Sequence, residues 1–329
     1  MKPTGPKNKN HTTGELHPRN LHRAPYDFPR LIAALPELAP FVQPHPLAGD
    51  TIDFANPAAV LTLNRALLKL HYGIAHWDLP SGFLCPPVPS RADYLHHAAD
   101  LLAADTADKT IPCGPAIRAL DLGTGANAIY PLLAASLFGW RVTGTDIDPA
   151  SINWARQLAA ANPPLAPLLD FRLQPSASAL FANITAPTDS FALSLCNPPF
   201  HASPDEAAAG TLRKIRNLGS PTARSSAKLA LNFGGRPNEL WCPGGEVAFI
   251  RRMIAESAAR PALCVWFTTL VSKRASLPLL ERALHSAHPH DVRIITMFAG
   301  QKQSRLLAWT FLSPAERRTR LTSVTSTPA

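Results

Sequence analysis

The chain has 329 residues, 46% of them hydrophobic and 17% charged, and its 32 Lys and Arg against 23 Asp and Glu give a net charge of +9. The apolar share is sufficient for a globular core, and this composition excludes a chain that is disordered throughout. The longest uncharged apolar stretch, residues 262–272, is about half of the roughly 20 residues that a membrane-spanning helix needs, so we expect no membrane span.

The first residues and the cysteines indicate a cytoplasmic protein. The N-terminus is polar and basic, without the apolar core that a secretory signal requires. The five cysteines are scattered and never spaced as C-x-x-C, a pattern that supports neither a disulfide framework nor a zinc site. We therefore expect a cytoplasmic protein without a bound metal.

The first third of the chain is predicted to be an arm followed by helices. Residues 1–24 are polar and predict a flexible basic arm, because they have little apolar surface to bury. Residues 25–112 predict a helical extension. One helix follows Asn56 and Pro57, an N-cap with proline at the first helical position, and a second runs from Arg91 to Leu102. The four prolines of residues 80–91 favour an extended segment between them.

Residues 113–314 alternate between strands and helices and predict an α/β fold. Helices are expected near 127–138, 149–161, 246–259 and 275–287. Strands are expected at 116–122, 141–147, 169–173, 191–196, 262–270, 292–298 and 306–312. This order predicts a mostly parallel seven-stranded sheet with right-handed crossovers, and the last two strands predict an antiparallel hairpin at its edge. Residues 201–245 form a basic insertion, and residues 315–329 predict a disordered tail.

A glycine turn after the first of these strands predicts a cofactor pocket. Gly123 and Gly125 let the backbone approach a ligand closely, and Asp146 ends the next strand, where a carboxylate can accept hydrogen bonds from ribose hydroxyls. The turn also fits the dinucleotide pattern G-x-G-x-x-A. Asp121, however, would repel a pyrophosphate, whereas it would attract the sulfonium and ammonium of S-adenosylmethionine. The turn favours a methyltransferase. A dehydrogenase and a turn that binds no ligand are the alternatives.

The tetrad after the fourth strand indicates the chemistry. Asn197, Pro198, Pro199 and Phe200 follow a strand whose carboxyl end faces the predicted cofactor turn. The Asn197 Oδ1 atom and the Pro198 carbonyl can accept the two N–H groups of a conjugated amine, and Phe200 offers a face on which a base can stack. A loop turn with one buried phenylalanine is the alternative. Combined with the glycine turn and Asp146, the tetrad predicts an amino-group methyltransferase that uses S-adenosylmethionine.

The tetrad does not identify the substrate, because it also occurs in enzymes that methylate glutamine amides in proteins and adenine or cytosine in DNA. Charge is the better indication. A net charge of +9 and a basic insertion beside the tetrad are typical of proteins that bind a phosphate backbone. The candidate RNA-binding residues are Arg19, Arg213, Lys214 and Arg216. A solvated basic surface is the alternative. Trp241, within the insertion, is a further candidate for base stacking.

Long, dispersed motifs then identify a family. From His17 almost to Phe311, the chain closely resembles the bacterial 23S rRNA adenine-N6-methyltransferases of the RlmF type, within a METTL16-like superfamily. The motifs that carry this resemblance are residues 52–57, 82–89, 91–94, 120–127, 196–200, 216–219, 231–235, 239–242, 244–246 and 300–305.

The resemblance implies a class I, Rossmann-like fold that transfers a methyl group from S-adenosylmethionine to N6 of one adenine in 23S rRNA. It implies a donor site of Arg91, Gly123, Asp146 and Asn197, with the tetrad as acceptor clamp. Asp146 stands where relatives usually have glutamate, and in the 174–175 loop a proline replaces the usual lysine; Ser176 is a further donor-site candidate.

The expected partner is 23S rRNA or a large-subunit assembly intermediate, bound by a monomer. A protein-glutamine N-methyltransferase and a non-catalytic RNA-binding factor on the same fold are the alternatives.

Overall fold

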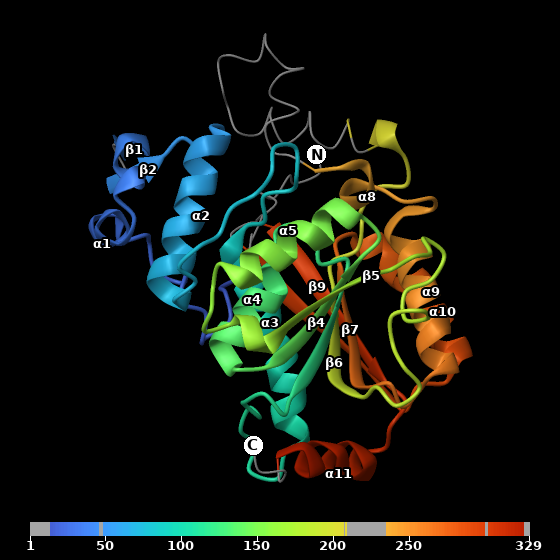
Figure 1. Cartoon of the computed structure of the whole chain (residues 1–329). Helices are drawn as coiled ribbons and strands as arrows, with labels where there is room; N and C mark the ends of the chain where they lie inside the picture. The colour runs from blue at the N-terminus through green and yellow to red at the C-terminus, as the bar shows by residue number, and fades with distance from the viewer. Residues whose placement is uncertain (1–13, 46–48, 207, 209–234, 300–301, 326–329) are drawn as a thin grey trace, which may run out of the picture.

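The computed structural model describes residues 14–45, 49–206, 208, 235–299 and 302–325, and its centre is a seven-stranded sheet. The strand order is β5-β4-β3-β6-β7-β9-β8, with β3 to β7 parallel and β9 antiparallel to both neighbours (Figure 1). The predicted mostly parallel sheet with an antiparallel edge hairpin is confirmed. The strands are β3 (Arg118–Leu122), β4 (Arg141–Asp146), β5 (Leu169–Leu173), β6 (Phe191–Cys196), β7 (Cys264–Val271), β8 (Asp291–Ala299) and β9 (Lys302–Thr310).

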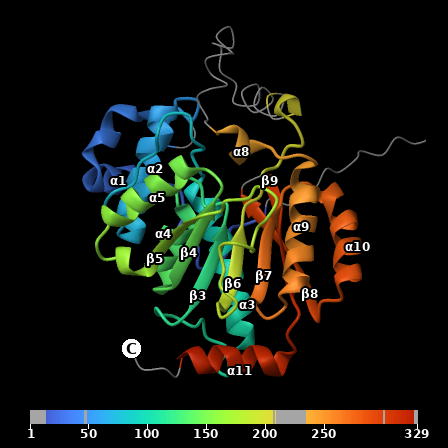
Figure 2. The same ribbon diagram turned by 45° about the vertical axis from the view of Figure 1, so that its right-hand side comes forward.

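Helices cover both faces of the sheet, because its strands are apolar on both sides (Figure 2). Ala119 of β3 packs in the hydrophobic cluster on one face, and the next residue, Leu120, packs in the cluster on the other. The first face is covered by α3 (Val88–Asp105), α4 (Ile129–Phe138) and α5 (Pro149–Ala160). The second is covered by α9 (Gly245–Ala259) and α10 (Leu277–Ala287). Short 3-10 helices lie at Ala166–Leu168 and Arg274–Ser276.

The N-terminal extension packs into the same core as the sheet. It comprises α1 (Phe28–Ala34), a 3-10 helix (Pro36–Phe41), two antiparallel strands β1 (Val42–His45) and β2 (Gly49–Ile52), and α2 (Pro57–Tyr72). The side chain of Asn56 accepts hydrogen bonds from two backbone N–H groups at the start of α2, as its N-cap position predicts. Phe28 and Leu67 share a hydrophobic cluster with Val142 of the sheet.

Helix α3 begins earlier than its sequence pattern indicates. The segment predicted to be extended ends at Pro87, and the helix starts at Val88 rather than at Arg91. Proline is tolerated in the first turn of a helix, where its missing N–H would have no intrahelical partner. Arg91 therefore lies within the first turns of α3, which fixes the direction of its side chain.

The prediction of a flexible arm is wrong for residues 14–24. His17 and Asn20 are buried against α3, where the His17 backbone N–H donates to Asp93 Oδ1 at 2.6 Å. The Asn20 Nδ2 atom donates to the Pro89 carbonyl at 2.9 Å. The segment is held by hydrogen bonds to α3 rather than by apolar burial, so a hydrophobic pattern could not reveal it. Residues 1–13 of the predicted arm lie outside the described residues.

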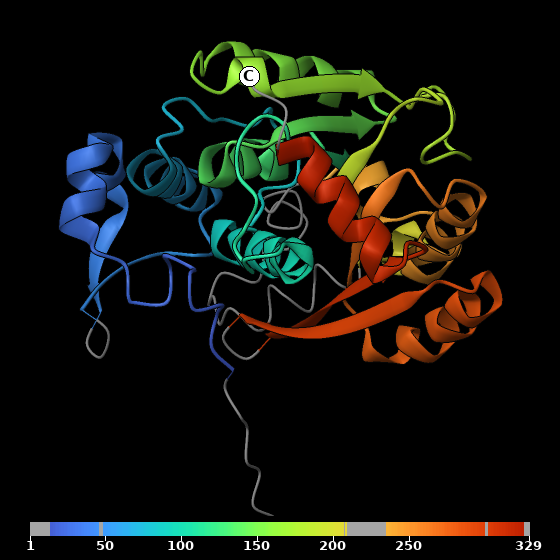
Figure 3. The same ribbon diagram turned by 90° about the horizontal axis from the view of Figure 1, so that it is seen from below.

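The prediction of a disordered tail is also wrong for residues 315–325, because Pro314–Thr325 form helix α11. Residues 326–329 lie outside the described residues. Figure 3 shows this helix lying across the lower end of the molecule, where it contacts α3. Arg317 and Asp105 form an ion pair at 2.8 Å with exposed side-chain fractions of only 5% and 7%. Among the described residues, no helix is both long and apolar enough to cross a membrane.

Candidate active site

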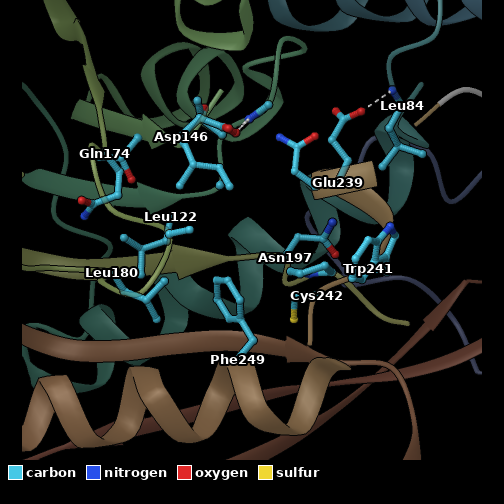
Figure 4. A pocket seen from close by; sticks show the side chains of 18 of the residues that line it. Leu84, Leu122, Asp146, Gln174, Leu180, Asn197, Glu239, Trp241, Cys242 and Phe249 are labelled. Carbon is cyan, nitrogen blue, oxygen red and sulfur yellow. Dashed lines mark hydrogen bonds between the residues drawn. The ribbon is translucent and has the colours of Figure 1, made fainter. Parts of the chain in front are cut away.

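A cavity of about 590 Å³ lies beyond the carboxyl ends of β3, β4 and β6 (Figure 4). Parallel pairing places these ends together, since Leu122 at the end of β3 lies beside Thr145 of β4 and Cys196 of β6. The predicted site residues on the cavity wall are Arg91, Gly123, Gly125, Asp146, Asn197 and Pro199. The sheet therefore brings together residues that are far apart in the sequence.

The glycine turn adopts a conformation that side chains disfavour. Gly123 and Gly125 have φ values of +74° and +62°, in the left-handed region. The Gly123 and Thr124 N–H groups both donate to the Thr145 carbonyl, at 2.9 and 2.8 Å, which ties the turn to the end of β4. The turn exposes its backbone to the cavity, as the sequence predicts.

Asp146 holds the neighbouring loops with both carboxylate oxygens. Its Oδ2 atom accepts from Gly125 N at 2.9 Å and its Oδ1 atom accepts from Asp148 N at 2.9 Å. Burial raises the pKa of Asp146, whose exposed fraction is 7%. Because each carboxylate oxygen has two lone pairs, the residue can still accept hydrogen bonds from a ligand.

Asp121 is fully buried, and neither of its carboxylate oxygens has a hydrogen-bond partner among the described residues. Burial raises the pKa of Asp121 to about 7, and the nearby negative charge of Asp146 adds to this rise. An unpartnered buried carboxylate is costly, and a positively charged ligand close by would offset the cost. The side chain is not on the cavity wall, so its effect on a ligand would be electrostatic.

Arg91 connects α3 to the tetrad. Its Nη1 atom donates to Asn197 Oδ1 and to the Tyr130 hydroxyl, both at 3.2 Å, and its guanidinium lies 5.7 Å from the centre of the Tyr130 ring. The contact fixes the direction of the Asn197 amide while leaving one lone pair of its oxygen for another donor. No local pattern singles out Arg91, which only the family resemblance identified.

The four residues of the tetrad contribute unequally to the cavity wall. Pro198 and Pro199 are buried and Phe200 is half-buried, and only Asn197 and Pro199 lie on the cavity wall. The chain after the tetrad pairs with residues 240–242, since His201 N donates to the Leu240 carbonyl at 3.1 Å and Cys242 N donates to the His201 carbonyl at 3.1 Å. This pairing places Trp241 on the wall beside Asn197 (Figure 4).

Several other predicted residues lie elsewhere. Ser176 is half-buried and bonds to Ser178, and it is not on the wall, whereas Gln174 and Ser178 are. Arg19 pairs with Asp100 at the surface of α3. Arg213, Lys214 and Arg216 lie outside the described residues. Within the part of the chain that the structure describes, no cluster of three or more His, Cys, Asp or Glu could hold a metal ion.

Several residues of this wall were not predicted from the sequence. Glu239 belongs to the short helix α8 (Pro237–Leu240), and Phe249 and Arg252 belong to α9. Glu239 lies in a motif of the family resemblance, which gave no role for it. None of the three follows a strand end or a glycine turn, so no local signal marked them.

A family of RNA methyltransferases matches residues 10–313 of the chain. The chain belongs to this family. Membership confirms the methyltransferase interpretation of the glycine turn and excludes the dinucleotide one. The chain is 48% identical over 324 residues to the ribosomal RNA large subunit methyltransferase F of Shewanella halifaxensis, covering 94% of this chain and 85% of the relative. It is 54% identical over 298 residues to the protein of that name from Ectopseudomonas mendocina, covering 91% and 89%.

Solved structures agree with this assignment. The human METTL16 catalytic domain in complex with the MAT2A 3′UTR hairpin 1 is 28% identical, with a TM-score of 0.74 over 91% of this chain and 96% of that one. The N-terminal domain of human METTL16 in complex with SAH is 27% identical, with a TM-score of 0.71 over 91% and 100%. The predicted class I methyltransferase fold is confirmed.

Proposed function

We propose that this protein transfers a methyl group from S-adenosylmethionine to N6 of a specific adenine in 23S rRNA. The observation that carries the proposal is one cavity lined by the glycine turn, by Asp146 and by Asn197 of the tetrad. The family and the large-subunit rRNA methyltransferases among its relatives support an RNA substrate.

The residues of the cavity fit the donor. Asp146 would accept hydrogen bonds from the ribose hydroxyls, and the backbone of Gly123 and Gly125 would allow close approach. The unpartnered carboxylate of Asp121 favours a ligand with positive charge. Arg91, on the same wall, would orient Asn197 and the carboxylate end of the donor. When bound, the donor supplies a methyl group activated by a sulfonium.

The tetrad fits an amine acceptor. The N6 amine of adenine is a poor nucleophile because its lone pair is delocalised into the ring. Hydrogen bonds from its two N–H groups to the Asn197 Oδ1 atom and the Pro198 carbonyl would localise that lone pair and aim it at the methyl group. Phe200 would stack on the base. After methylation the nitrogen loses a proton to solvent, so no strong general base is needed.

The test is a methylation assay with labelled S-adenosylmethionine and unmodified 23S rRNA, with Asn197→Ala and Ser178→Ala as variants. Wild type and Ser178→Ala should form N6-methyladenosine, because Ser178 is an exposed wall residue without a proposed role. Asn197→Ala should lose about 100-fold or more in turnover while still binding the donor, because it removes an interaction with the reacting amine. The labelled nucleoside is identified by mass spectrometry.

The alternatives predict other outcomes. A protein-glutamine methyltransferase would label glutamine in a protein and leave the RNA unlabelled. A non-catalytic RNA-binding factor would bind RNA without labelling anything, and its properties would not change in Asn197→Ala. Label only in large-subunit assembly intermediates would identify these, rather than free 23S rRNA, as the substrate. We also propose that the protein acts as a monomer in the cytoplasm. Sedimentation of the free protein tests whether it is a monomer.

A further inference from the structure

Two segments far apart in the sequence together form a roof over the cavity. We use this term for residues 82–86, before α3, and residues 235–240, which include α8. Gly235 N donates to the Gly82 carbonyl at 2.9 Å, and the Arg236 guanidinium lies 4.2 Å from the centre of the Phe83 ring. The two segments therefore hold one another in place.

Glu239 joins the two halves of the roof. Its Oε2 atom accepts from Leu84 N at 3.1 Å (Figure 4) and from Arg236 N at 2.8 Å. These bonds use only one of the two carboxylate oxygens. A Cβ atom placed on Gly125 would lie 3.3 Å from Glu239 Oε1, so the second oxygen faces the glycine turn. Glu239 is also on the cavity wall.

Acidic groups surround this turn. Asp146 accepts a hydrogen bond from Gly125 N, and Asp121 is buried at the end of the preceding strand. Burial raises the pKa of Glu239, and the negative charge of Asp146 adds to the rise. Glu239 thus faces the cavity from the side opposite the sheet. The backbone N–H groups of Leu84 and Arg236 and the charge of Arg236 compensate its charge only in part. A cationic ligand would compensate it.

We propose that Glu239 is a donor-binding residue whose negative charge favours S-adenosylmethionine over its demethylated product. The inference rests on the proposed function. S-adenosylmethionine carries one more positive charge than S-adenosylhomocysteine, because methyl transfer removes the sulfonium charge. A carboxylate facing a partly enclosed cavity therefore stabilises the donor more than the product, and it would favour exchange of product for donor after each turnover.

Glu239→Gln separates the charge of this side chain from its role in the roof. The amide oxygen of glutamine can accept the bonds from Leu84 N and Arg236 N, so the variant removes the charge and keeps the roof. We expect isothermal titration calorimetry to show that Glu239→Gln weakens binding of S-adenosylmethionine about three- to tenfold and changes binding of S-adenosylhomocysteine less than twofold. Glu239→Ala, which also releases the roof, should weaken both.

Glu256→Gln is the matched control. Glu256 also accepts backbone hydrogen bonds beside the cavity, from Leu180 N at 2.9 Å and Phe181 N at 2.8 Å, but it is not on the cavity wall. Its substitution should leave the ratio of the two affinities unchanged. An unchanged ratio in Glu239→Gln, or an equal change in both control and variant, would overturn the inference. A wild-type protein that binds neither ligand would instead contradict the proposed function.

Discussion

Asp121 is the residue whose protonation should respond most to the donor. Its buried carboxyl has a pKa of about 7, raised mainly by burial and further by the charge of Asp146, while the Thr124 hydroxyl and the charge of Arg91 oppose the rise. A nearby positive charge favours the ionised carboxylate. Binding of a cationic donor should therefore lower the pKa of Asp121 and release a proton, and donor affinity should rise as the pH rises through about 7.

This linkage predicts a pH profile. Between pH 6 and pH 7 the ionised fraction of a group with a pKa of about 7 rises about fivefold, and affinity for S-adenosylmethionine should rise by about the same factor. The ammonium of the donor, with a pKa of about 8, stays protonated over this range. Titration calorimetry at several pH values measures the profile.

Asp121→Asn provides the control for this prediction. It should bind the donor more weakly and with a flatter profile, and an equally steep profile in the variant would assign the pH dependence to another group.

The stability of the ligand-free protein should fall, rather than rise, as the pH increases. The carboxyl pKa is about 7 when folded and about 3.9 when unfolded, so wild type loses stability as the pH rises between these values. At pH 8, Asp121→Asn should therefore unfold at a higher temperature.

The site was predictable where its residues follow the sheet. Asp121, Asp146 and Asn197 each lie at or directly after a strand end, so alternating strands and helices sufficed to bring them together. Glu239 was not predictable, because its position depends on a contact with Leu84, 155 residues away in the sequence, and on an insertion without periodicity. Arg91 required the resemblance, since a single arginine on a helix has many ordinary roles.

At the scale of elements, apolar patterns in the sequence predicted the helices and strands that hydrophobic burial stabilises. Every predicted strand of the sheet is present, and α4, α5, α9 and α10 begin within two residues of their expected starts. The two segments wrongly predicted to be disordered, residues 14–24 and α11, are mostly polar and are held largely by specific hydrogen bonds and ion pairs. Their composition resembles that of a disordered segment, and only their contacts with α3 distinguish them from one.

One buried ion pair anchors helix α11, which also buries Leu321 in the hydrophobic cluster that includes Ala119. Arg317 Nε donates to Asp105 Oδ2, which also accepts a hydrogen bond from the Trp266 indole at 2.8 Å. Arg317→Ala would leave Asp105 buried without its charge partner, and we expect a loss of about 3–5 kcal/mol in the free energy of unfolding. Urea denaturation followed by circular dichroism measures this loss.

Arg318→Ala is the matched variant on the same helix, because its side chain is exposed. It should change stability by less than about 0.5 kcal/mol. Asp105→Asn combined with Arg317→Ala should recover part of the loss, because the uncompensated charge is then absent. A loss of the same size in both arginine variants would contradict a specific role of the ion pair, because alanine favours a helix at least as well as arginine.

At the scale of the whole molecule, charge and shape together determine how RNA would approach. Helix α8, which lines the cavity, lies at one end of the sheet, and α11 lies at the opposite end (Figures 1 and 2). The proposed RNA-binding residues of the insertion, Arg213, Lys214 and Arg216, lie 13 to 16 residues after Phe200 in the sequence. A net charge of +9 would attract a phosphate backbone from a distance, and the insertion would then hold it close to the tetrad.

Salt dependence tests this arrangement. Binding of a 23S rRNA fragment should weaken linearly on a plot of log affinity against log salt, because each neutralised phosphate releases counterions. Replacing Arg213, Lys214 and Arg216 together by alanine should reduce the slope by about 2–3, and Arg19→Ala by up to about 1. Arg318→Ala, which removes one positive charge from α11, should leave the slope unchanged. If the slope fell by the same amount per charge removed in the insertion and in α11, net charge rather than a defined surface would account for RNA binding.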